Sequence, residues 1–409
     1  MQASQGGARR LLVSACATDR LAVARAWLCE RGPSEEVLVV GANAPAAAEL
    51  VRRAAQDAGG AFGWHRTAIA RLAAALAARA LVASGRVPVG RLVSEAVVAR
   101  VLHELGQDGE LGRFARTGRG PGLARALTSV LEEVRGEELE PEQIAAAAPE
   151  LARVFSAYGA ALAAAGLADR AAVERLAAEA AREAGRSPWF DLPTVLLDLP
   201  APSAALRALL EALVARAPAC LATLPEGDAR AIAAFEELLG VAAERGDSGD
   251  EPTALRALQR HLFRDSAPKP RVPDETVAML SAPGESRECV EIARRIHAAV
   301  RDGIPFDRIA VLLRAPDAYG PFLAEALRRA GVPAHFARGA RRPDPSGRAL
   351  LALLACAAEN YSARRFAEYL SLGEVPLRAP GGDPPAALPP DERWVPPDAE
   401  LVAPRIAEA

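Results

Sequence analysis

The sequence predicts an α/β protein with two parallel-sheet lobes, the first interrupted by a block of helices. Short apolar runs alternate with amphipathic stretches in two parts of the chain, as strands and helices do in a parallel sheet. Hydrophobic residues make up 51% of the chain and aromatic residues 4%. Alanine and leucine therefore carry the apolar content, which favours packed helices over a β sandwich. The 409 residues suggest two to three domains.

The first lobe is predicted to be discontinuous, with residues 1–66 and 187–263 on either side of a helical subdomain at 67–186. Its strands and helices alternate at residues 11–15, 18–30, 37–41 and 45–58, and further strands follow at 194–199 and 220–224. The inserted block contains apolar residues at helical spacing and no convincing strand. Its expected helices span about residues 67–83, 90–106, 120–135, 150–165 and 168–185.

A linker is predicted at residues 264–275, which contain three prolines and charges of both signs but no apolar period. A second lobe is expected over 276–376, followed by a proline-rich tail at 377–409 that suggests a truncated architecture. The expected strands of the second lobe are 277–281, 309–314 and 332–336, and the expected helices are 285–301, 319–330 and two that begin near 346 and 362.

An ordered set of motifs lies in the second lobe. A helix with the spacing E-x-x-x-I-A-R-x-I spans Glu288 to Ile296, and a strand of the form D-x-I-A-V-L-x-R spans Asp307 to Arg314. A helix led by Tyr319 and a tight turn at Gly331 to Pro333 follow. With these motifs, residues 284–376 resemble the second RecA-like domain of superfamily 1 helicases, and in particular the AddB-type branch.

The N-terminal half resembles the same family through fewer residues. His65, Arg66 and Thr67 open a helix as in the family's T-x-x-x-L-A element, and Tyr158, Leu162 and Asp169 match a helix pair. The segment LLDLP at residues 196–200 stands where a Walker B strand would be.

The resemblance implies two RecA-like lobes that act in DNA double-strand-break repair beside an active helicase–nuclease subunit. Full members of this family continue into a further helical domain and a PD-(D/E)XK nuclease, and the sequence contains no motif of either. The chain is therefore expected to be a fragment of a longer protein. The expected partners are single-stranded DNA or a duplex end, and the active subunit.

The residues after the first strand do not form a P-loop. A P-loop needs glycines that let the backbone wrap phosphates, and a lysine for the β- and γ-phosphate oxygens. This segment reads SACATDRLAVAR, and the single lysine of the chain is Lys269. Phosphate could still meet backbone amides at Thr18 and Asp19, but the aspartate would repel it. The favoured interpretation is that Thr18 or Asp19 caps the helix.

Asp198 is the candidate Walker B aspartate. The residues after it are Leu199 and Pro200, so the second carboxylate that would orient water is missing, and Asp198 is expected to cap the next helix or to be a relic. Arg314 resembles the arginine that faces the triphosphate in active helicases, with an ion-pair residue as the favoured alternative. We expect a vestigial nucleotide site of Thr18, Asp19, Asp198 and Arg314.

Several other chemistries lack their motifs. A PD-(D/E)XK nuclease needs a lysine two residues after an acid, and Lys269 follows Ala267 at that spacing. The five histidines show no HxxxH pair and the five cysteines no CxxC pair. The sequence therefore predicts no catalytic residue, metal or cofactor. The scattered cysteines, the absent leader and the interrupted apolar stretches indicate a cytoplasmic protein without membrane spans.

Candidate DNA contacts are Arg341 and Arg342 in a loop, Arg364 in a helix, and Thr67, which resembles a position that touches single-stranded DNA in this helicase class. For the helical arginine a solvent-facing role, and for Thr67 a helix cap, remain the alternatives. The net charge of −3 leaves DNA contact to local arginine surfaces. A non-catalytic DNA scaffold is predicted. An enzyme or motor with a nonstandard phosphate site, and a protein-contact module, remain alternatives.

Overall fold

The computed structural model describes residues 9–117, 121–183, 187–246, 253–262, 270, 272, 274–337 and 345–371. The chain divides into two compact units, Met1–Val277 and Ala278–Ala409. Most of the linker predicted at 264–275, and the tail predicted at 377–409, lie outside the described residues.

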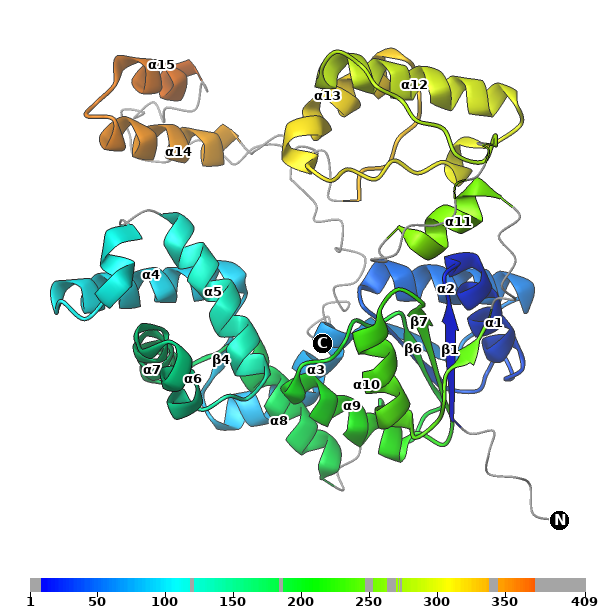
Figure 1. Cartoon of the computed structure of the whole chain (residues 1–409), viewed down its shortest axis with the longest axis horizontal. Coiled ribbons are helices and arrows are strands. Elements are labelled where there is room, and N and C mark those ends of the chain that lie inside the picture. Colours follow the sequence, from blue (N-terminus) through cyan, green and yellow to red (C-terminus); the bar gives the residue numbers. More distant parts are fainter. Residues whose placement is uncertain are drawn as a thin grey trace, which may run out of the picture. The chain divides into compact units, whose positions relative to one another are not determined.

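The first unit contains a six-stranded parallel sheet in the order β3-β2-β6-β7-β1-β8 (Figure 1). The predicted α/β class is thereby confirmed. β6 pairs with β2, although the whole helical block separates them in sequence. The strands are β1 (Arg9–Ser14), β2 (Val37–Gly41), β3 (Trp64–Ala68), β6 (Thr194–Leu197), β7 (Cys220–Pro225) and β8 (Glu244–Arg245).

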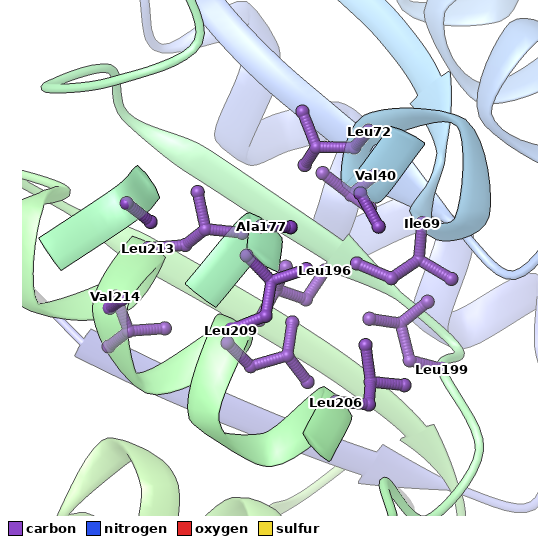
Figure 2. Packing of buried hydrophobic residues seen from close by; sticks show 14 of the residues in the cluster. Val40, Ile69, Leu72, Ala177, Leu196, Leu199, Leu206, Leu209, Leu213 and Val214 are labelled. Carbon is purple, nitrogen blue, oxygen red and sulfur yellow. The ribbon is translucent and has the colours of Figure 1, made fainter. Parts of the chain in front are cut away.

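Helices cover both faces of this sheet. On one face, α1 (Ala17–Cys29) and α2 (Ala44–Asp57) pack on Val37 and Val39. On the other face, Leu38 and Val40 belong to a larger core with residues of four further helices (Figure 2). Because successive strand residues point to opposite faces and both faces are buried, β2 is a continuous apolar run. The four helices are α3 (Ile69–Ala83), α8 (Arg170–Arg182), α9 (Ala204–Arg216) and α10 (Ala229–Leu239).

The helical block differs from its prediction in two respects. α3 and α8 pack into the core of the sheet, whereas the four helices between them form a separate apolar core. Two short strands, β4 (Val87–Pro88) and β5 (Leu167–Ala168), pair in parallel where no strand was expected. Strands of two residues are too short to show an apolar period. The four helices are α4 (Arg91–Gln107), α5 (Pro121–Gly136), α6 (Pro141–Ala147) and α7 (Pro149–Ala164).

The first unit ends with a short helix, α11 (Ala254–His261). The second unit contains α12 (Glu285–Arg301), α13 (Pro316–Arg329), α14 (Pro345–Ala358) and α15 (Ala363–Ser371). In the described part of the chain, no helix is both long and apolar enough to cross a membrane.

The three strands predicted in the second unit are wrong as strands. Residues 277–281, 309–313 and 332–336 form no strand in the structure. Ile309, Leu313 and Phe336 do pack against the apolar core that α12 and α13 share, whereas Leu312 is 94% exposed. The apolar pattern therefore identified which residues face the helices, but it did not establish the hydrogen-bonded neighbours that a sheet requires.

Candidate functional site

Three adjacent strands, β6, β7 and β1, bring polar residues together at the carboxyl end of the first sheet. Ser14 is the last residue of β1, Thr223 lies in β7, and Asp198 follows β6 directly. Parallel sheets of this kind usually bind ligands in the crevice at this end. The sequence thus folds so that the Walker B candidate lies beside the start of α1.

Arg20, in the first turns of α1, forms a forked ion pair with Asp198. Its Nε lies 3.0 Å from Oδ1 and its Nη2 lies 2.9 Å from Oδ2 of Asp198. Its Nη1 also donates to the carbonyl oxygen of Ser14 at 2.6 Å. The side chain of Arg20 is 8% exposed and that of Asp198 is 32% exposed. The guanidinium therefore joins the ends of β6 and β1.

Two further features hold Asp198 in this pair. The hydroxyl of Thr223 donates to Oδ1 of Asp198 at 2.8 Å, and the amide of Asp198 donates to the carbonyl oxygen of Thr223 at 3.0 Å. Asp198 has a φ of 47°, in the left-handed region that aspartate and asparagine tolerate better than most residues. The expected capping role is wrong, because Ser203 caps α9.

Neither Thr18 nor Asp19 caps α1. The N-cap is Cys16, which forms no side-chain capping bond, and Thr18 is exposed. One carboxylate oxygen of Asp19 accepts from Arg256 of α11 at 3.0 Å and lies 3.5 Å from the hydroxyl of Ser14. A carboxylate thus lies near the amides that a phosphate would need, and it would repel that phosphate.

The site has the charges of a structural ion pair. Phosphate oxygens would compete with Asp198 for Arg20, and the carboxylate of Asp19 would oppose them. Within the described ranges, no group of three His, Cys, Asp or Glu side chains could hold a metal ion. Sequence reasoning missed Arg20; the available signal was an arginine in the first turns of the helix that follows β1.

The remaining candidate residues are not brought to this site within the first unit. Thr67 lies in β3, two residues before α3 begins, and its side chain is buried. Arg314 and Arg364 are exposed residues of the second unit. Arg341 and Arg342 lie outside the described residues. The expectation that Thr67 opens a helix is corrected, because the parallel pairing of β3 with β2 extends to Ala68.

The matched residues of the helix pair form a buried polar contact at the base of the helical block. Asp169 caps α8 through the amide of Ala172 and forms an ion pair with Arg135 of α5. The guanidinium carbon of Arg135 lies 5.7 Å from the ring centre of Tyr158. Burial raises the pKa of the Tyr158 hydroxyl. These residues connect the two apolar cores of the first unit.

One comparison with known proteins relates part of the chain to a DNA-processing protein. A segment of 120 residues is 31% identical to an ATP-dependent helicase/deoxyribonuclease subunit of Symbiobacterium thermophilum. The match covers 26% of this chain and 10% of that relative's length. No protein-family model matches the chain.

Proposed function

We propose that this chain is a non-catalytic, helicase-like scaffold within a helicase–nuclease subunit of DNA repair, which binds or channels DNA beside an active partner. The local similarity to a helicase/deoxyribonuclease subunit supports the DNA-repair class. The ion pair between Arg20 and Asp198 supports the non-catalytic role. A function for Asp198 in metal binding would require this carboxylate to leave its guanidinium partner, and the neighbouring residues supply no second acid to orient water.

DNA contact in this proposal comes from arginine surfaces that bind the phosphate backbone. Arg364 is exposed on α15, whereas its neighbour Arg365 forms ion pairs with Glu359 and Glu368. Arg364 therefore offers its charge to solvent, and Arg341 and Arg342 are the loop candidates. Backbone contacts of this kind position a nucleic acid without reading its sequence.

A binding measurement tests the DNA role. We expect the purified chain to bind a fluorescent single-stranded oligonucleotide at low salt and to release it steeply as salt rises, because arginines displace condensed counterions. Replacing Arg341 and Arg342 together with Ala should weaken binding and lower the salt slope by about one to two units. Replacing Arg52 and Arg53 with Ala is the matched control, because it removes the same charge from an exposed part of α2.

A second candidate function is protein contact without DNA. The α14–α15 pair exposes several large apolar side chains, including Leu351 at 64% and Leu354 at 58%, and exposed apolar patches often mark protein interfaces. A folded chain that shows no oligonucleotide binding at low salt would favour this function over the scaffold.

A turnover measurement tests the absence of catalysis. With Mg²⁺ present, we expect neither ATP hydrolysis nor DNA cleavage, because the lysine that both chemistries require is absent from the first lobe. Turnover that Asp198→Ala abolishes would contradict the proposal and would favour an enzyme with a nonstandard phosphate site.

A further inference from the structure

The short helix α11 lies across the carboxyl end of the first sheet (Figure 1). Arg256 Nη1 donates to Asp19 Oδ2 at 3.0 Å, and Arg260 Nε lies 3.9 Å from Glu226 Oε2. Asp19 follows β1 and Glu226 follows β7, and these strands are neighbours. The helix therefore bridges the ends of two adjacent strands, beside the pair formed by Arg20.

Charged residues of α11 face the sheet, and apolar residues face away from it. Arg256 and Arg260 lie one turn apart on the same side of the helix. Leu255, Leu258 and Leu262 occupy the opposite side, and each is at least 41% exposed. Ala257 is the one buried residue within α11. Polar contacts contribute more than apolar burial to the attachment of this helix, and such segments open locally at low cost.

The start of α11 is capped by residues from farther along the chain. The carboxylate of Asp274 accepts from the amide of Ala254 at 2.6 Å, and the hydroxyl of Thr276 accepts from the amide of Leu255 at 3.0 Å. The first unit ends at the next residue, Val277. The same helix that contacts the sheet therefore also holds the segment that leads into the second unit.

We propose that α11 is a strap that closes the carboxyl end of the first sheet with the chain's own side chains. In parallel sheets a bound ligand usually occupies this position. Here the strap attaches the segment at Asp274 and Thr276 to the first unit without a nucleotide. Because the attachment is largely ionic, salt and loss of either arginine open the strap while the sheet stays folded. The inference does not depend on whether the chain binds DNA.

Hydrogen exchange followed by mass spectrometry on the full chain tests the strap. In Arg256→Ala we expect the amides of α11 to exchange roughly three- to tenfold faster, the range for loss of one partly exposed ion pair. The amides of β1, β6 and β7 should be unchanged. Asp274→Ala should act in the same direction, because it removes the cap at the other side of the strap. The control is Arg25→Ala, which removes an ion pair between Arg25 and Asp57 away from the strap.

Two results would overturn the proposal. One is an exchange rate in α11 that is the same in Arg256→Ala, Asp274→Ala and the Arg25→Ala control. The other is a slower exchange of α11 when ATP and Mg²⁺ are added to the unaltered chain, because a nucleotide would then fill the crevice and complete the attachment. If Arg256→Ala also accelerates the sheet amides, the Asp274→Ala variant decides.

Discussion

Loss of the ion pair between Arg20 and Asp198 should destabilise the first unit substantially. Removing one member of a buried pair costs about 3–5 kcal/mol, because the other charge is left without its partner. Asp198 is 32% exposed and keeps the hydroxyl of Thr223, so we place Arg20→Met at about 2–3 kcal/mol. For a unit of this size, that corresponds to a melting temperature lower by roughly 5–10 °C.

A double-mutant cycle separates the ion pair from other effects. Arg20→Met keeps most of the aliphatic stem, and Asp198→Asn suits the left-handed backbone while removing the charge. We expect the double variant to recover part of the loss, because no unpaired charge remains. Urea unfolding of the full chain, monitored by circular dichroism, provides the free energies. An Arg20→Met variant within about 0.5 kcal/mol of the unaltered chain, or single effects that simply add, would refute this reasoning.

Gly63→Ala should destabilise by about 1–3 kcal/mol, since its Cβ would overlap a backbone carbonyl group ahead of β2, whereas Gly32→Ala, with nothing within 4 Å, should have little effect in the same urea assay. Hydrogen bonds from two neighbouring arginines lower the pKa of Glu49 from 4.5 to about 2. Its depressed pKa stabilises the fold above pH 4.5, so Glu49→Gln should cost less than about 1 kcal/mol at pH 7, and this difference should vanish as pH falls to about 2. Burial raises the pKa of Cys220 to about 12, so a thiol reagent at pH 8 should label the exposed Cys29 and leave Cys220 unmodified until the chain unfolds.

Local patterns in the sequence determined the class of the fold and most of its helices. The apolar run at Val37–Gly41 indicated a strand buried on both faces, and the structure has β2 there, between helices on either side. The return of strands near Thr194 and Cys220 indicated that the chain rejoins its first sheet, and β6 and β7 do so. These features are readable because burial imposes a short period on neighbouring residues.

The tertiary structure alone decided which residues share the candidate site. Arg20 and Asp198 are 178 positions apart in the chain, and no local period relates them; the order of β6, β7 and β1 brings them together. The same limit explains the second unit, where apolar spacing located the inward side chains but not sheet partners. Hydrogen-bond partners and ion pairs depend on contacts between distant segments, and a sequence pattern records only the burial that those contacts produce.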